Sequence, residues 1–223
     1  MRKHILEVDS VQMHFGFKSI LSDVYLKCET GDIIGVLGKN GSGKSTLLKI
    51  IFGIIQADFK CIRIDGQVKS KTKDLFPHIS YLIQENFIPS HFSVKKAILL
   101  SIENNTIVDF YNDAIIQSIQ EKKIFQLSGG ELRYLEIKLM LSNASKFVLL
   151  DEPYNGLAPI IIEKINALII QKAKTKGVII TDHNYENVIK VSTKLLLMKD
   201  GKTHHLKAEK ELIEKGYLKA GMI

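Results

Sequence analysis

One eight-residue segment, GKNGSGKS at residues 38–45, constrains the fold of this chain more than any other feature. It follows a short apolar run, Ile33 to Leu37, and it precedes a segment of helical character, Ser45 to Phe52. A buried strand, a glycine-rich turn and a helix in this order direct backbone N–H groups and the positive end of the helix dipole at one anion. The pattern GxxxxGK[S/T] in this setting predicts a site for the phosphates of a nucleotide.

The residue types of this phosphate loop suggest individual roles. The Lys44 ammonium can reach the β- and γ-phosphates, and the Ser45 hydroxyl can ligate Mg²⁺. The alternative is a glycine-rich turn that only joins the strand to the helix. We assign the following residues to nucleotide binding: Gly38, Asn40, Gly41, Ser42, Gly43, Lys44, Ser45 and Thr46.

Composition excludes several broad classes of protein. The 223 residues are 45% hydrophobic and 25% charged, which is typical of a globular chain and not of a disordered or fibrous one. No run approaches the roughly 18 apolar residues of a membrane-spanning helix. The N-terminal segment that begins with Met1 meets acidic residues before any long apolar stretch, so we expect no secretory signal and a cytoplasmic location. Cys28 and Cys61 match no metal-ligand spacing, and we expect both to be buried and reduced.

The order of apolar patterns predicts an α/β fold. Alternation in Ile5 to Val11 and in Ser19 to Cys28 indicates antiparallel strands. Helical periodicity dominates Val94 to Ser145, and strands and helices alternate after it. Further strands are expected at Cys61–Ile64, His78–Ile83, Phe147–Leu150, Val178–Thr181 and Lys194–Met198, with helices at Pro159–Lys172 and Tyr185–Val191.

These elements predict a phosphate-loop NTPase core with a mainly parallel sheet, an N-terminal antiparallel β subdomain and an inserted helical subdomain. We expect a single domain over residues 1–223. Its ATP-binding core would comprise residues 1–84 and 146–223, and its helical subdomain residues 85–145.

Two adjacent carboxylates follow a strongly apolar strand. Asp151 and Glu152 come directly after Phe147 to Leu150, at the carboxyl end where open parallel sheets place their ligand sites. We expect Asp151 to hold Mg²⁺, and Glu152 to accept a proton from an attacking water or to orient that water. In the alternative interpretation, both acids cap the next helix, for which Pro153 would be suitable.

A third motif, LSGGE at residues 127–131, places Ser128 23 residues before Asp151. The Ser128 hydroxyl, the unshielded amides of Gly129 and Gly130 and the dipole of a following helix could together contact an anion. Taken alone, the segment could equally be a helix N-cap. We refer to residues 127–131 as the signature segment.

The phosphate loop, the signature segment and the apolar strand ending in Asp-Glu, in this order, resemble the ATP-binding cassette (ABC) ATPases from about Val8 to Leu206. The resemblance implies that the signature segment of one subunit closes over the γ-phosphate held by the phosphate loop of another. It also implies roles for three more residues. Phe15 would stack on adenine, Gln84 would touch Mg²⁺ and the attacking water, and His183 would contact the γ-phosphate.

Each of these three roles has a simpler alternative. Phe15 could pack in the core, with Phe17 as a rival for the adenine. Gln84 could be a surface turn residue, and His183 could be structural.

Two positions depart from the common family pattern. Glu131 stands where most members have Gln, and Ala158 stands where most have an Asp that communicates across the dimer. The GLAP sequence at residues 156–159 is similar to branched-chain amino-acid importer ATPases, whereas TDHN at residues 181–184 is similar to lipopolysaccharide-exporter ATPases.

The resemblance implies the ATP-binding and hydrolysing subunit of an ABC transporter. Such a subunit would form a homodimer or a cassette heterodimer around two ATP and Mg²⁺, would drive integral-membrane permease subunits, and would lie peripherally on the inner face of the cell membrane. One alternative is a soluble ABC ATPase that acts on ribosomes or nucleic acid, but such proteins usually carry two cassettes or a long coiled-coil insertion. A GTPase or small-molecule kinase is a weaker alternative, because the chain lacks an NKxD motif.

The chain carries 31 Lys and Arg against 24 Asp and Glu, a net charge of +7. Residues 160–223 hold 12 basic and 7 acidic residues, which is 12 − 7 = +5 of that excess. We expect this basic region to face solvent or a membrane surface, and we do not expect it to bind nucleic acid. Neutralising Lys172, Lys174 and Lys176 is therefore expected to leave ATP hydrolysis intact.

Overall fold

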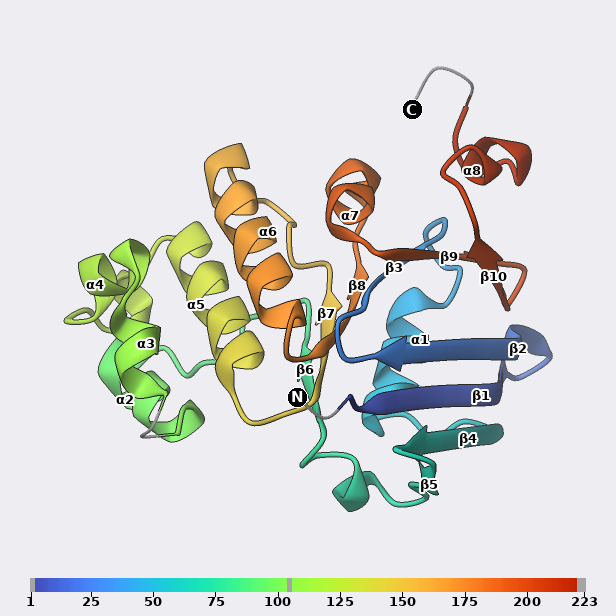
Figure 1. Cartoon of the computed structure of the whole chain (residues 1–223), viewed down its shortest axis with the longest axis horizontal. Coiled ribbons are helices and arrows are strands. Elements are labelled where there is room, and N and C mark those ends of the chain that lie inside the picture. The colour runs from blue at the N-terminus through green and yellow to red at the C-terminus, as the bar shows by residue number, and fades with distance from the viewer. Residues whose placement is uncertain (1–2, 104–105, 220–223) are drawn as a thin grey trace.

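The computed structural model of the chain describes residues 3–103 and 106–219 (Figure 1). The prediction that there is no secretory signal rests on the N-terminal segment. Its first two residues, Met1 and Arg2, lie outside the described residues. No helix in the described part of the chain has both the length and the apolar character needed to cross a membrane.

The described strands form one mixed sheet in the order β5-β4-β1-β2-β10-β9-β3-β8-β7-β6. Strands β9, β3, β8, β7 and β6 run parallel to one another, whereas β1 pairs antiparallel with both β2 and β4. The strands are β1 (Ile5–Phe15), β2 (Lys18–Glu29), β3 (Ile33–Leu37), β4 (Phe59–Ile64), β5 (Gln67–Val68), β6 (Ile79–Leu82), β7 (Phe147–Asp151), β8 (Gly177–Thr181), β9 (Lys194–Lys199) and β10 (Lys202–Leu206).

The central parallel strands are buried on both faces, which explains their continuous apolar sequences. Every residue of β3, β7 and β8 is buried. Successive side chains of a strand point to opposite faces, so Val148 and Leu150 enter one hydrophobic cluster while Phe147 and Leu149 enter another. The sheet therefore separates two cores.

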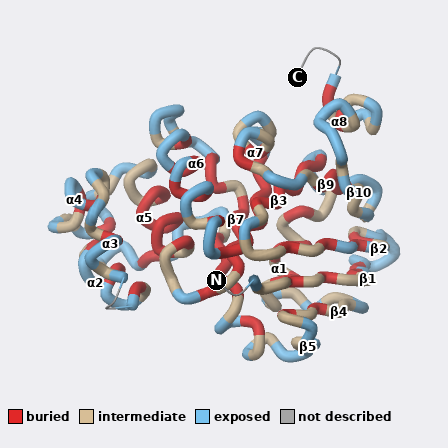
Figure 2. The backbone as a smooth tube through the Cα atoms, viewed as in Figure 1, coloured by how far each residue is buried: buried red, intermediate tan, exposed pale blue. Residues whose placement is uncertain are grey.

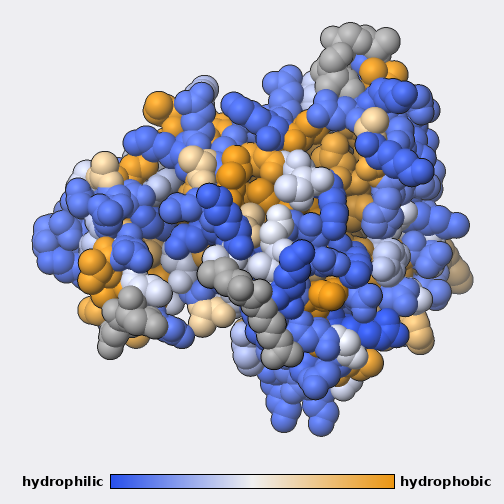
Figure 3. Space-filling view, in the orientation of Figure 1, coloured by the Kyte–Doolittle hydropathy of each residue, from blue (hydrophilic) through white to orange (hydrophobic). Residues whose placement is uncertain are grey.

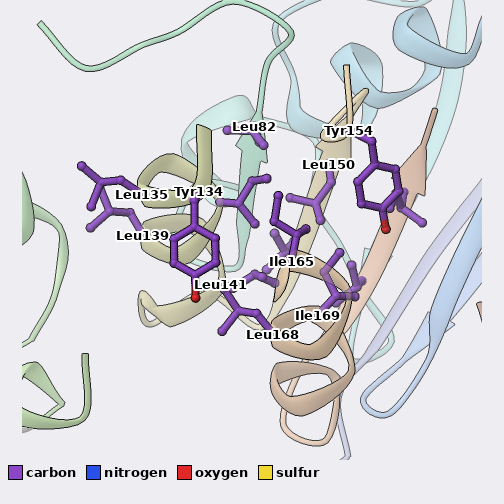
Figure 4. Packing of buried hydrophobic residues seen from close by; sticks show 14 of the residues in the cluster. Leu82, Tyr134, Leu135, Leu139, Leu141, Leu150, Tyr154, Ile165, Leu168 and Ile169 are labelled. Carbon is purple, nitrogen blue, oxygen red and sulfur yellow. The ribbon is translucent and has the colours of Figure 1, made fainter. Parts of the chain in front are cut away.

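Helices cover both faces of the parallel strands (Figures 1 and 2). The first core lies under α5, α6 and α7, and Figure 4 shows Leu150 of β7 beside Ile165 of α6. The second core lies between the sheet and α1. The helices are α1 (Lys44–Phe52), α2 (Val94–Ser101), α3 (Ile107–Tyr111), α4 (Ala114–Ile119), α5 (Gly129–Ser142), α6 (Pro159–Ala173), α7 (Tyr185–Val191) and α8 (Glu211–Glu214).

The predicted fold class is confirmed. The sheet is mainly parallel in its centre, antiparallel strands precede it, and α2 to α5 lie between β6 and β7. Four short elements were not predicted: β5, β10, α8 and a 3₁₀ helix at Thr72–Asp74.

Two predictions about individual side chains need correction. Cys28 is buried and Cys61 is only half-buried, although both are free. The expectation that Lys172, Lys174 and Lys176 share an exposed basic face is wrong for Lys176, which is 7% exposed. Its ammonium donates to the backbone carbonyls of Asn143 and Ser145, in the segment that joins α5 to β7. The face of the molecule seen in Figure 3 is mostly hydrophilic, with an apolar area between α6 and α7.

Candidate functional site

The phosphate loop connects β3 to α1 through a backbone that only glycine adopts easily. Gly41 and Gly43 have φ angles of 75° and 98°, in the left-handed region. A Cβ on Gly38 would lie 2.6 Å from the Ser42 Oγ and 2.7 Å from the Met198 carbonyl oxygen. The glycine spacing of the motif is thus required by the turn itself, and it leaves the amides of the loop unshielded.

Lys44 begins α1 and folds back over this loop. Its Nζ donates to the carbonyl oxygen of Gly38 at 2.7 Å and to that of Lys39 at 3.2 Å. Burial lowers the pKa of Lys44, and the nearby carboxylates of Glu152 and Asp151 oppose that shift. The side chain is therefore held at the loop, where its donors can exchange carbonyl oxygens for phosphate oxygens.

Asp151 ends β7 and its carboxylate accepts three side-chain hydrogen bonds. Its Oδ1 accepts from Ser45 Oγ at 2.9 Å and from Thr181 Oγ1 at 2.8 Å, and its Oδ2 accepts from the Tyr81 hydroxyl at 2.9 Å. The side-chain amide of Gln84 donates to Ser45 Oγ at 3.5 Å. Ser45, Gln84 and Asp151, the three predicted metal-binding residues, thus lie together at the carboxyl ends of β6 and β7 and the start of α1.

Glu152 and His183 form a pair beside Asp151. The distance from Glu152 Oε1 to His183 Nε2 is 2.8 Å. Glu152 has a φ of 48°, unusual for a residue with a side chain, and its N–H donates to the Thr181 carbonyl oxygen at 2.8 Å. The alternative that these acids cap the next helix is wrong, because α6 begins at Pro159 with Ala158 as its N-cap.

A cavity of about 440 Å³ joins these groups. Phe15 lines it and is 57% exposed, so the core-packing alternative for Phe15 is wrong, and Phe17 is fully exposed and does not line it. The cavity is lined by Phe15, Lys18, Ile20, Asn40, Gly41, Ser42, Gly43, Lys44, Ser45, Thr46, Gln84, Glu152 and His183. One chain therefore brings together a glycine loop, an ammonium, an aromatic ring and a carboxylate–imidazole pair.

The signature segment does not line this cavity. Ser128 is the N-cap of α5: its Oγ accepts from the Glu131 N–H at 3.2 Å, and Glu131 accepts from the Ser128 N–H at 2.7 Å. The N-cap alternative is thus realised, and it leaves the segment accessible, since a Cβ on Gly130 would meet nothing within 3.6 Å. Within one chain, Ser128, Gly129 and Gly130 do not line the cavity at the phosphate loop.

Several residues at the site were not singled out from the sequence. Tyr81 and Thr181 hold the Asp151 carboxylate, and Arg133 of α5 donates to the carbonyl oxygens of Ile83, Asp151 and Glu152 at 2.8, 3.1 and 3.2 Å. Glu136, one turn later, accepts from the Phe87 N–H at 2.8 Å. Thr181 could have been identified from the sequence, because it ends an apolar strand as Asp151 does. Apart from their polarity, nothing in the sequence around Arg133 or Tyr81 indicates that they belong to the site.

Comparison with known proteins places this site in a family context. The family model described as "ABC transporter" matches residues 21–155. The Lipopolysaccharide export system ATP-binding protein LptB of Haemophilus influenzae is 30% identical over 219 residues, covering 89% of this chain and 88% of that protein. The ABC transporter A family member 11 of Dictyostelium discoideum is 31% identical over 196 residues, but the chain spans only 24% of its length.

Solved structures agree in fold. The ATP binding subunit of an ABC transporter superposes with a TM-score of 0.83 at 18% identity, covering 97% of this chain and 95% of that one. A bacterial Atm1-family ABC exporter with ATP bound gives a TM-score of 0.82 at 18% identity, with 96% of this chain matching 41% of that one.

Proposed function

The chain belongs to the ABC transporter family, and we propose that it works as a dimer that drives membrane permease subunits through ATP hydrolysis. It is an ATP-binding protein and an ATPase. The observation that carries the proposal is that the phosphate loop and the Glu152–His183 pair line the same cavity.

The loop fits a nucleotide polyphosphate. Ser42 Oγ is buried and has no hydrogen-bond partner in the described residues, next to amides whose glycines leave them uncovered. A buried hydroxyl without a hydrogen-bond partner destabilises the fold, and a bound ligand that forms a hydrogen bond with it would remove this penalty. We assign the adenine to Phe15, whose exposed ring lines the same cavity.

The oxygen donors fit Mg²⁺. Ser45 and Asp151 supply a hydroxyl and a carboxylate, and Gln84, whose Nε2 faces Ser45, carries an amide oxygen as well. These are the hard oxygen ligands that Mg²⁺ takes together with water and phosphate oxygens. Within the described residues no three His, Cys, Asp or Glu side chains are grouped as a metal site of their own, so phosphate and water would complete the coordination. When bound, Mg²⁺ neutralises charge on the β- and γ-phosphates.

Three residues of the chain have separate roles in the proposed hydrolysis. Lys44 holds the β- and γ-phosphates, as its position over the loop favours. The Glu152 carboxylate accepts the proton of the attacking water, and His183, 2.8 Å from it, holds that carboxylate and contacts the γ-phosphate.

We infer that a second cassette, identical or homologous, completes each site with its own Ser128, Gly129 and Gly130. The separation of the signature segment from the cavity within one chain supports this arrangement. ATP would then hold two subunits together until hydrolysis removes the interaction.

We assign residues 1–84 and 146–223 to the ATP-binding core and residues 85–145 to a helical subdomain that receives the permease near Gln84. Exposed apolar side chains of that segment, Phe87, Leu99 and Leu100, support a protein contact there. The protein would therefore lie on the cytoplasmic face of the cell membrane. A family member acting on ribosomes or nucleic acid is the competing function, and ATPase activity stimulated strongly by RNA or DNA but not by permease-containing vesicles would favour it.

Glu152→Gln tests the proposed catalytic role. Removing the proton acceptor is expected to lower ATP turnover by about 10² or more while nucleotide binding persists. Turnover is measured by phosphate release and binding by a fluorescent ATP analogue. Glu163→Gln, an exposed change on α6, is the matched control and should keep wild-type turnover. A Glu152→Gln protein with normal turnover would show that another group is the base.

A further inference from the structure

The carboxylate that ends β7 is held by a tyrosine that the proposed hydrolysis does not use. Tyr81 of β6 is 8% exposed, and its hydroxyl donates to Asp151 Oδ2 at 2.9 Å. We propose that Tyr81 is a positioning residue that fixes the rotation of the Asp151 carboxylate for the divalent cation of the nucleotide. The proposal rests on the proposed function and names a residue beyond it.

The distribution of donors on Asp151 makes Tyr81 distinctive. Oδ1 accepts from two hydroxyls, those of Ser45 and Thr181. In the described residues, Oδ2 accepts only from Tyr81. Ser45 is the residue assigned to the cation, so its hydroxyl oxygen would be shared with that ion. Thr181 on one oxygen and Tyr81 on the other are the two donors with no such second role, and they hold the plane of the carboxylate.

The sheet register explains why this residue is a tyrosine. Tyr81 pairs with Leu149, and Asp151 lies two residues further along β7, on the same face. Only a long side chain spans that step. The ring is held by Phe52, the last residue of α1, with centroids 5.5 Å apart, and Phe52 packs in turn on Phe76 at 5.1 Å. The helix that begins at the phosphate loop thus ends against the ring that orients Asp151.

The chemistry of the hydroxyl suits a permanent donor. A carboxylate only accepts hydrogen bonds, so this bond runs from the Tyr81 phenol to Asp151 Oδ2. Outer-shell partners of this kind typically contribute 10- to 100-fold to metal affinity or activity.

Tyr81→Phe is the decisive variant, because it deletes the hydroxyl and keeps the ring. With Mn²⁺ as the probe and a non-hydrolysable ATP analogue bound, electron paramagnetic resonance should report Mn²⁺ affinity about 10-fold weaker than in the wild type. Binding of the analogue without metal should be unchanged. ATP turnover should fall at low Mg²⁺ and recover in part at high Mg²⁺.

Tyr134→Phe is a matched control. Tyr134 is also buried, and its hydroxyl donates to the Asp113 Oδ2 at 2.6 Å, in a pair that includes no residue assigned to the nucleotide. This variant should bind Mn²⁺ as the wild type does. Phe52→Leu, which keeps the Tyr81 hydroxyl but removes the neighbouring ring, should weaken Mn²⁺ binding by a smaller factor, and it serves as the second test if Tyr81→Phe is too unstable to assay.

The outcomes separate the two proposals. A wild-type protein without Mg²⁺-dependent ATPase activity would refute the proposed function. An active wild type whose Tyr81→Phe variant binds Mn²⁺ with unchanged affinity would refute only the role of Tyr81. Equal weakening in Tyr81→Phe and Tyr134→Phe would indicate a general loss of stability and would overturn the positioning role as well.

Discussion

Lys176 is a buried lysine in a basic region that was expected to face solvent. It is 7% exposed, and its ammonium donates to the carbonyl oxygens of Asn143 and Ser145, between α5 and β7. Burial lowers its pKa to about 8, with a further contribution from Lys172. An exposed neighbour, Lys174, has no such environment.

This shift predicts a pH dependence of stability. Between pH 8 and pH 10.5 the folded protein has lost the Lys176 proton and the unfolded chain still holds it, so unfolding takes up a proton and rising pH disfavours it. The contribution of Lys176 to the free energy of unfolding should therefore increase by about 3 kcal/mol across this window. Below pH 8 both states are protonated and the contribution is constant.

Urea unfolding of the wild type and of Lys176→Met at pH 7.5, 9 and 10.5 measures this effect as a difference. The other titrating groups cancel in that difference. Lys174→Met should show no such trend. The free energy of unfolding of the wild type minus that of Lys176→Met should rise with pH. If this difference stays constant or falls as the pH rises, the lowered pKa of Lys176 is contradicted.

Residues that act through shape or through a distant partner escaped prediction. The glycines of the phosphate loop, Asp151 and Glu152 were identified because each carries its chemistry in a local pattern. Tyr81 and Arg133 depend on which strand lies beside β7 and on where α5 crosses the strand ends, and these are properties of the folded chain. Sequence pattern thus located Lys44, Asp151 and Glu152, which are proposed to act on the nucleotide and its cation, but not the side chains that hold them in place.

At the scale of elements, long apolar segments were predictable and short polar ones were not. Strands β3, β7 and β8 read as strands because both their faces are buried. Strand β10, with the sequence KTHHL, has little apolar character and forms because it pairs antiparallel with β9 and joins β2 to the sheet. Helix α8 has four residues and is anchored by one buried side chain, that of Leu212.

The N-terminus of α5 carries two roles that one substitution can separate. Ser128 caps the helix, and it is also proposed to contact the γ-phosphate bound by a second subunit. Ser128→Ala should cost about 1 kcal/mol of stability through the lost cap. Aspartate is as good an N-cap as serine, so Ser128→Asp should keep the melting temperature while its negative charge repels the phosphate and lowers ATP turnover at least about 10-fold.

Thermal unfolding and phosphate release on the same two variants give the comparison. If Ser128→Ala loses turnover only in proportion to its lost stability, and Ser128→Asp is fully active, then Ser128 only caps the helix and does not contact the γ-phosphate.

At the scale of the whole molecule, the separation of the signature segment from the nucleotide cavity predicts complementation between two inactive chains. Lys44→Ala removes the phosphate-loop ammonium, and Ser128→Asp blocks the signature segment. In a mixed dimer, one site combines the intact loop of the Ser128→Asp chain with the intact signature segment of the Lys44→Ala chain. The other site contains both defects.

Mixing the two inactive proteins should therefore restore ATP hydrolysis. If subunits exchange at random, half of the dimers are mixed and each holds one intact site of two, so about one quarter of wild-type activity is expected when the sites act independently. Phosphate release is measured before and after mixing, with each variant mixed with itself as the control. Sites built within single chains would give no recovery, because every chain in the mixture would still carry its own defect.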